Sequence, residues 1–234
     1  MVVAINQPTY FPWMGYFELI AKADIFVYLD CVQYVHHEWN NRNRLKGSNS
    51  ESFWISVPVK KCQLETPIYD ITIANDPPNK KWRKKHIMAI TSALGKAPYF
   101  KSLWSKLENI LMREISNLSE LNIALIKAIS NNLGIEKQMY RASEFKTSGK
   151  RTELILDICK TFSATEYYSP AGAAIYLEKE KYLFDNNGII VTYQNFQHPK
   201  YPQQFGHFIS HMSILDPLMN IGIEKTRKLL IKNE

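Results

Sequence analysis

The sequence has few of the residues that stabilise secreted or metal-binding domains. Its 234 residues include only three cysteines, Cys31, Cys62 and Cys159, which are widely separated and have no CxxC spacing. This pattern excludes a disulfide framework and a zinc knuckle, so we expect three reduced thiols. His, Cys, Asp and Glu residues also show no metal-ligand spacing, and we expect no metal site.

Long apolar runs are also absent. No uncharged apolar stretch approaches the ~20 residues that span a bilayer. The first residues, MVVAINQP, lack the basic region, apolar region and cleavage site of a signal peptide. We therefore expect a cytoplasmic protein without membrane insertion. The 45% apolar content suffices for one sizeable core, so we expect a single domain over residues 1–234, with a possible helical subregion at 80–145.

The formal net charge of +7 is concentrated in one short segment, residues 80–85, which contains five positive charges. Apolar residues at Trp82, Ile87 and Ile90 predict that this segment is one face of an amphipathic helix. A solvated basic face explains the charge without a nucleic-acid site. The same face is a candidate contact for an acidic partner such as an acyl carrier protein.

The first thirty residues predict a βαβ unit. An apolar run at 2–6 ends at Gln-Pro, helical spacing follows at 14–23, and a second apolar run covers 24–30. Further strands are expected at 53–59, 68–73, 166–168 and 189–194, and helices at 80–95, 103–115, 120–133, 152–160, 173–184 and from 215 onward, with an interruption near Gly222. The alternation predicts an α/β fold: a three-layer, Rossmann-like core with a mostly parallel sheet and an additional helical region.

Two unusual segments follow the first two predicted strands: residues 7–17 (QPTYFPWMGYF) and 30–44 (DCVQYVHHEWNNRNR). Ligands of parallel sheets bind beyond the carboxyl ends of the strands, where both segments begin. We therefore predict that the two segments converge on one cavity. In the first segment, two prolines hold Gln7, Tyr10 and Trp13 in a rigid turn, and rigid aromatic rings make good ligand walls.

The second segment combines groups suited to binding and to proton transfer. The planar fork of Arg42 suits a phosphate or carboxylate, while Gln33 and Asn41 suit sugar hydroxyls or an amide. The rings of Tyr34 and Trp39 are further candidate contacts. Candidates for proton removal are His37, or its neighbour His36, and Asp30, while Cys31 is a candidate nucleophile whose alternative is a buried, inert thiol.

Other motifs are incomplete. Residues 149–152 (GKRT) lack the first glycine of a phosphate loop, which leaves Lys150 as a candidate anion contact at a helix N-terminus. Ser213 and Asp216 match a helix-capping pattern, and a Ser-His-Asp triad drawn from this region lacks a nucleophile elbow. Residues 12–20 have the glycine and the following Leu-Ile helix of a nucleotidylyltransferase loop, but they contain neither of its histidines.

The segments QPTYFPWMGYFELIAKADIFVYLD, VQY, W-x-N-R-N, HPKY-x-Q-x-F-G-x-F and SILDPLMNIG closely resemble the WbqC-like proteins of O-antigen and other surface-polysaccharide gene clusters. The resemblance covers essentially the whole chain. It implies acyl or aminoacyl transfer, glycyl transfer included, to the amine of a nucleotide-linked amino sugar. His211 stands where we expect asparagine from the pattern, which disfavours a role in catalysis. The residues that the resemblance carries over are Gln7, Pro8, Tyr10, Pro12, Asp30, Gln33, Tyr34, Trp39, Asn41, Arg42, Ser213, Asp216 and Asn220.

Three functional hypotheses follow. The first is an acyltransferase with no tightly bound cofactor, whose co-substrate is a coenzyme A or acyl-carrier-protein thioester. In it His37 or Asp30 removes the proton, and Arg42 and Lys150 bind phosphate. The second is a non-catalytic module that binds a nucleotide sugar or a carrier protein. The third is a nucleotidylyltransferase, which the missing histidines disfavour. The oligomeric state is left open.

Overall fold

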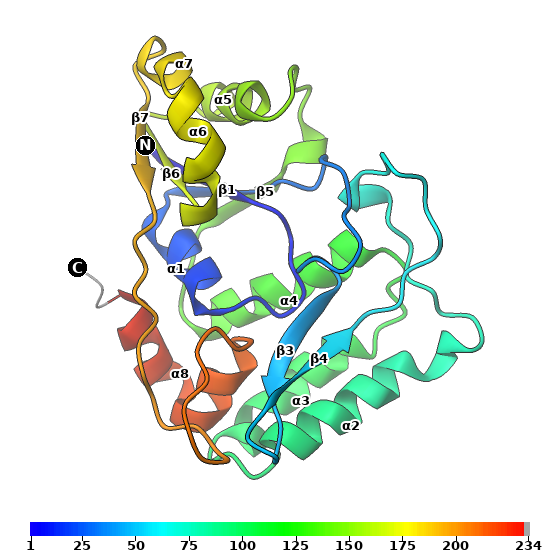
Figure 1. The fold of residues 1–234 in the computed structure, drawn as a ribbon. Helices are drawn as coiled ribbons and strands as arrows, with labels where there is room; N and C mark the ends of the chain where they lie inside the picture. The colour runs from blue at the N-terminus through cyan, green and yellow to red at the C-terminus, as the bar shows by residue number, and fades with distance from the viewer. Residues whose placement is uncertain (232–234) are drawn as a thin grey trace.

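The centre of the fold is an all-parallel sheet of five strands in the order β5-β2-β1-β6-β7. The computed structural model describes residues 1–231. The strands are β1 (Val2–Asn6), β2 (Ile25–Tyr28), β5 (Gln138–Arg141), β6 (Glu166–Ser169) and β7 (Ile190–Tyr193) (Figure 1). The chain moves outward from β1 to β2 and β5, then returns to the other side of β1 for β6 and β7. The strand order therefore reverses between β1 and β6, and ligands bind at this point in open parallel sheets.

Helices cover both faces of the sheet. Val3 and Ile5 of β1 face one apolar cluster, while Ala4 faces the other, because successive strand residues point to opposite sides. The first cluster is covered by α5 (Thr152–Thr161), α6 (Ala174–Glu180) and α7 (Tyr182–Asp185), and the second by α1 (Met14–Lys22). Burial on both faces explains why β1 and β2 are continuous apolar runs. The expected three-layer, Rossmann-like core is confirmed.

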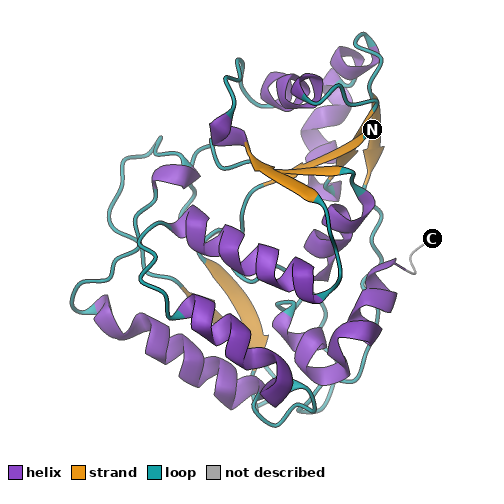
Figure 2. Cartoon of the chain, turned by 180° about the vertical axis from the view of Figure 1, so that it is seen from behind, coloured by secondary structure: helices purple, strands orange, loops and turns teal. Residues whose placement is uncertain are grey.

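The additional helical region lies between β2 and β5. It contains the antiparallel hairpin of β3 (Arg42–Lys46) and β4 (Ser52–Ser56), the short helices η1 (Ile68–Asp70) and η2 (Asn79–Lys81), and the helices α2 (Trp82–Leu94), α3 (Phe100–Leu111) and α4 (Leu118–Asn132). Figure 2 shows these helices gathered beside the hairpin. Their buried residues share one apolar cluster with α1 and with the last helix, α8 (Leu215–Ile231). The insertion and the sheet thus share a continuous core.

Some local features differ from the sequence prediction. The expected strand at 68–73 is wrong, because this segment begins with the 3-10 turn η1 and makes only isolated bridges. The helix expected from residue 120 begins at Leu118 instead, and Asn117 caps it by accepting a hydrogen bond from the Glu120 amide at 3.0 Å. Gly222 has a φ of +80° and breaks α8 at the predicted place.

Among the described residues, no helix is both long enough and apolar enough to span a bilayer.

Candidate functional site

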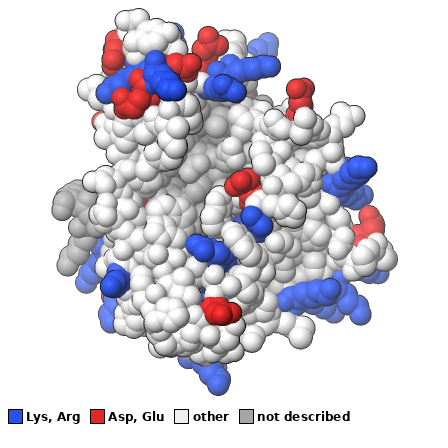
Figure 3. Space-filling view, viewed as in Figure 1, with Lys and Arg blue, Asp and Glu red and all other residues white. Residues whose placement is uncertain are grey.

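A cleft lies at the carboxyl ends of β1, β6 and β7, where the strand order reverses. It consists of two cavities, of about 400 Å³ and 520 Å³, that share Asn6, Trp13, Tyr16 and Trp39. The first cavity is completed by Thr9, Pro12, Asn43, Arg44 and His211. The second is completed by Gly15 and by residues 170–172 and 194–197, which follow β6 and β7. Figure 3 shows the hollow on the front face, with acidic and basic side chains below it.

The two polar segments of the sequence lie side by side along this cleft. The Asn40 amide nitrogen is 3.2 Å from both the Gln7 side-chain oxygen and the Pro8 carbonyl oxygen, and it donates to both. The Tyr10 backbone amide donates to the Trp39 carbonyl at 3.0 Å. These bonds account for the polar residues of both segments, since the amide side chains satisfy the backbone of a loop that has no regular partner.

A third segment, residues 211–214, joins them from the far end of the chain. Ser213 forms an antiparallel bridge with Trp13, and its backbone amide donates to the Arg44 carbonyl at 3.1 Å. The Ile214 amide donates to the Pro12 carbonyl at 2.9 Å. This bridge places the His211 ring 4.9 Å from the Trp13 ring, centroid to centroid.

A cation lies beside two exposed tryptophans, Trp39, which lines the cleft, and Trp54, which does not. The Arg44 guanidinium carbon is 5.8 Å from the ring centroids of both Trp39 and Trp54, and no carboxylate of residues 1–231 forms an ion pair with it. Its Nε is buried without a hydrogen-bond partner. Arg42, two residues earlier on the same face of β3, instead stacks over Trp54 at 4.1 Å and lines neither cavity. The guanidinium that faces the cleft is therefore Arg44, not the predicted Arg42.

The imidazole at the cleft is that of His211. Burial and the nearby Arg44 charge hold the pKa of His211 below its usual value, so the ring is neutral near pH 7 and can accept a proton. Behind it lies His198, with the ring centroids 4.8 Å apart, and burial together with His211 lowers the pKa of His198 to about 4. His198 Nδ1 donates to the Pro199 carbonyl at 3.0 Å, which leaves its Nε2 as a buried acceptor without a partner.

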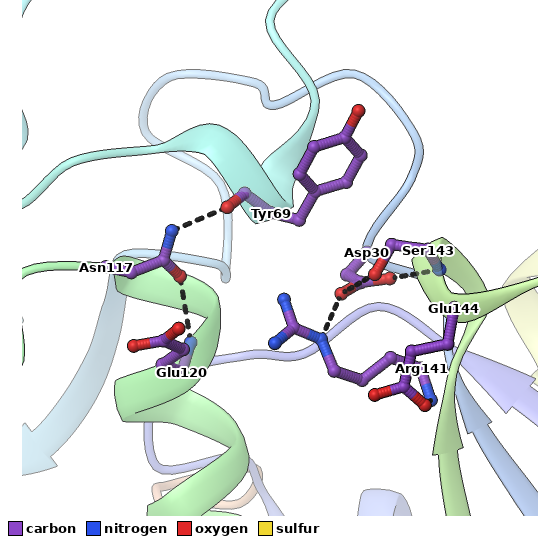
Figure 4. Close-up of polar contacts among 7 residues, drawn as sticks. All are labelled: Asp30, Tyr69, Asn117, Glu120, Arg141, Ser143 and Glu144. Atoms are coloured by element: carbon purple, nitrogen blue, oxygen red, sulfur yellow. Dashed lines mark hydrogen bonds and ion pairs between the residues drawn. The ribbon is translucent and has the colours of Figure 1, made fainter.

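Asp30 lies outside the cleft and has a structural role. Its carboxylate is fully buried and accepts hydrogen bonds from Arg141 Nε at 2.8 Å and from the Ser143 amide and hydroxyl at 2.9 Å (Figure 4). These contacts tie the end of β2 to the turn after β5. Because its oxygens are occupied and it lines neither cavity, the structure does not support the predicted catalytic role of Asp30.

The other two predicted catalytic residues also lie outside the cleft. Cys31 lines neither cavity, and burial together with the adjacent Asp30 raises the pKa of its thiol, which disfavours a thiolate nucleophile. His37 is exposed on a bend with a φ of +62°, and its ring contacts His36 rather than the cleft. We therefore leave Cys31 and His37 out of the site.

Several predicted binding residues belong to the supporting framework. Tyr10 is fully buried, so it is no ligand wall, and its hydroxyl donates to Nδ1 of His86 at 2.9 Å. The Nε2–H of His86 donates to the Ser56 carbonyl at 3.2 Å, and burial lowers the pKa of this ring to about 4. Asn41 is buried, and its amide nitrogen donates to the Val57 carbonyl at 3.0 Å.

Gln33, Tyr34 and Lys150 also line neither cavity. Gln33 is exposed and pairs through its backbone with Pro67. Tyr34 is buried, which raises its pKa to about 12, and Lys150 is exposed just before α5. A function at the cleft is therefore not supported for these three residues. Of the predicted binding residues, only Trp13 and Trp39 contribute side chains to the lining.

Residues 213–220 position the site rather than lining it. Ser213 is fully buried, and its hydroxyl accepts from the Leu215 amide at 3.3 Å at the start of α8. The reciprocal bonds of the predicted capping pattern with Asp216 are not formed, because the Ser213 amide donates to the Arg44 carbonyl. Asp216 is buried and accepts from the Asn220 amide at 3.3 Å, and burial raises its pKa to about 6. Lys46, which donates to the His207 carbonyl, provides a nearby positive charge.

Sequence reasoning missed Asn6, Arg44 and Gln194 and disfavoured His211. Two of these had a usable signal: Asn6 ends the first strand and Gln194 follows the last, so the rule that pointed to residues 7 and 30 applies to them as well. Arg44 also lies in the predicted segment 30–44, but Arg42 was favoured over it. His211 had no such signal, because a long-range bridge between Trp13 and Ser213 brings it to the cleft.

The five-stranded parallel sheet, covered by helices on both faces and with a cleft where its strand order reverses, identifies this protein as a Rossmann-like α/β protein. The sequence matches the WbqC-like protein family over residues 7–228, and the chain belongs to this family. It is also 36% identical over 225 residues to the uncharacterized protein Rv1507c of Mycobacterium tuberculosis (strain ATCC 25618 / H37Rv), which covers 95% of this chain and 94% of that protein. No solved structure gave a significant match.

Proposed function

We propose that this protein binds a nucleotide-linked amino sugar in the cleft and transfers an acyl or aminoacyl group from a thioester to the sugar amine. The observation that carries the proposal is the Arg44 guanidinium, which has no carboxylate partner among the described residues and lies between rigid aromatic rings where ligands of such sheets bind. Membership of the WbqC-like family supports it.

The lining suits each part of such a ligand. Arg44 offers a planar fork to a phosphate, and the rings of Trp13 and Trp39 offer flat surfaces to a base or a sugar ring. The two cavities, at about 400 Å³ and 520 Å³, lie within the ~300–1,000 Å³ typical of small-molecule sites. The adjoining cavities leave room for a nucleotide and for the thioester that reacts with it.

His211 is the proposed general base. A sugar ammonium must lose one proton before its nitrogen attacks the thioester carbonyl carbon, and His211 accepts that proton directly or through one water. His211 passes this first proton on to water. When the C–N bond forms, the nitrogen gives up a second proton, which His211 accepts and returns to the sulfur as the C–S bond breaks and the thiol leaves. Because the pKa of His211 is lowered, its neutral, accepting form prevails near neutral pH.

A basic surface supports an acyl carrier protein as one source of the thioester. Arg83 is committed to the fold, since its guanidinium donates to the carbonyls of Leu111 and Ile115 and to the Asn75 side chain. The exposed lysines around it remain free to meet an acidic surface; they are Lys80, Lys81, Lys84 and Lys85. Electrostatic attraction of this kind raises association rates and weakens with salt.

The proposal is tested by incubating the protein with UDP-glucosamine and dTDP-linked 4-amino-4,6-dideoxyglucose, each with acetyl or glycyl thioesters of coenzyme A and of acyl carrier protein. Mass spectrometry should detect a new amide, with release of one thiol per amide formed. Saturable binding without amide or thiol would contradict catalysis and favour the non-catalytic module. Pyrophosphate release from a nucleoside triphosphate would favour nucleotidylyl transfer, and absence of any binding would refute the proposal.

A further inference from the structure

A buried carboxylate lies directly behind the second cavity. Glu18 of α1 is 1% exposed, and its Oε1 accepts from the Tyr168 hydroxyl at 2.9 Å and from Lys22 at 3.2 Å. Its Oε2 accepts from Nε2 of Gln194 at 2.5 Å. Both carboxylate oxygens are paired, which is what allows the charge to be buried, and one of the partners, Gln194, borders the second cavity.

This pairing fixes the orientation of the Gln194 amide. Its Nε2 donates to the Gly15 carbonyl at 2.6 Å as well as to Glu18. A carbonyl and a carboxylate can only accept, so the amide nitrogen must face inward. The Gln194 oxygen has no hydrogen-bond partner in residues 1–231 and is not a buried unsatisfied atom, so it is the atom that faces the cavity.

The cleft therefore has opposite electrical character at its two ends. In the first cavity, the Arg44 guanidinium provides positive charge. In the second, a fixed carbonyl oxygen is backed by a carboxylate, although Lys22 partly balances that charge. Between them, Asn6 borders both cavities, and its oxygen accepts from the Gln7 amide at 2.9 Å.

We propose that the second cavity is the subsite for the substrate amine, with Gln194 as the specificity-determining acceptor and Glu18 as its positioning residue. This inference rests on the proposed function. The Gln194 oxygen accepts one N–H of the amine. Because His211 lines the first cavity and not the second, the proton that the amine loses passes to His211 through water. A ligand with phosphates at one end and an ammonium at the other matches the two ends of the cleft.

The test compares binding of two matched ligand pairs by calorimetry: UDP-glucosamine with UDP-glucose, and the dTDP-linked 4-amino sugar with its 4-hydroxy counterpart. Glu18→Gln removes the carboxylate that orients Gln194, and Gln194→Met removes the acceptor at similar volume. Gln63→Met, on an exposed loop, is the matched control. Because a hydrogen bond to a charged group is stronger than a neutral one, either variant should lower the preference for amine over hydroxyl by about 10-fold.

The outcomes separate the inference from the proposed function. Loss of the amine preference in Gln194→Met, with the hydroxyl ligand still bound, supports the subsite. If Gln194→Met prefers the amine ligand as strongly as the wild type does, the subsite is overturned and the proposed function stands. The same holds if the wild type binds both members of a pair equally. Failure of all four ligands to bind the wild type overturns both. If Glu18→Gln does not fold, Gln194→Met decides.

Discussion

Two arginines of the same strand provide the sharpest test of the site. Arg42 and Arg44 lie on the same face of β3, yet only Arg44 lines the cleft, while Arg42 stacks over Trp54. We predict that Arg44→Met weakens binding of a nucleotide sugar and that Arg42→Met does not. The two variants remove the same charge and the same donors, so any difference between them reports the position of the guanidinium.

The expected magnitude follows from the contacts of Arg44. A hydrogen bond to a charged group contributes about 1.5–3 kcal/mol, so Arg44→Met should raise Kd by roughly 10- to 100-fold. Arg42→Met should change Kd by less than about 3-fold, the effect of a distant screened charge. Stability should change little in Arg44→Met, since Arg44 has no ion pair among the described residues and its buried Nε has no partner.

The assay is calorimetric titration of each variant with UDP-glucosamine, alongside thermal unfolding. At higher salt concentration, the Kd values of Arg44→Met and the wild type should differ less, because salt screens the charge of Arg44. Equal losses of affinity in the two variants, or a larger loss in Arg42→Met, would refute the assignment of Arg44 to the phosphate. A larger loss in Arg42→Met would assign phosphate binding to Arg42, the residue that the sequence favoured.

Three further predictions address the imidazoles and the buried ion pair. His211→Asn should lower kcat by about 100-fold or more. The wild-type kcat/KM should fall as the pH drops through the lowered pKa of His211. If kcat/KM of the variant falls at low pH as much as that of the wild type, His211 is not the base. Asp30→Asn should destabilise the fold by about 3 kcal/mol, because it breaks a buried pair with Arg141. The Kd for UDP-glucosamine, measured on the folded variant, should stay unchanged. A stable variant that had lost only turnover would instead support the catalytic role of Asp30. His86 has a pKa of about 4 in the fold, so the unfolded chain binds a proton at this ring first as the pH falls. Between pH 7 and pH 5, the free energy of unfolding measured in urea should therefore fall by about 2 kcal/mol more in the wild type than in His86→Gln. Equal losses of stability would contradict a buried neutral ring.

The local elements of the core were predictable because each has a short-range cause. Continuous apolar runs predict strands buried on both faces, which is how β1 and β2 were found. Gly222 marks the break in α8 because its φ of +80° suits glycine. The edge strand β5 (Gln138–Arg141) was missed, since an edge strand that is only partly buried lacks an apolar run.

The position of the cleft at the strand ends was also accessible from the sequence, but the side chains that line it were only partly so. Residues 7–17 and 30–44 were singled out by their aromatic, amide, imidazole and guanidinium groups and by their position after strands, and Trp13 and Trp39 do line the cleft. Most other polar residues of these segments instead bond to the backbone, as Asn41 does with Val57. Composition cannot distinguish an amide that binds a ligand from one that satisfies a loop.

The sequence by itself determined the fold class, the first βαβ unit and the family, since these depend on periodicity, on turn residues and on motifs contiguous in the chain. Only the tertiary structure decided which residues meet. Arg44 and His211 are far apart in sequence, and backbone pairing of residues 12–13 with 213–214 brings them to one cavity. Glu18 and Gln194 meet in the same way, because α1 packs over the end of β7. Such contacts come from the closure of long chain segments, which no local pattern of residues encodes.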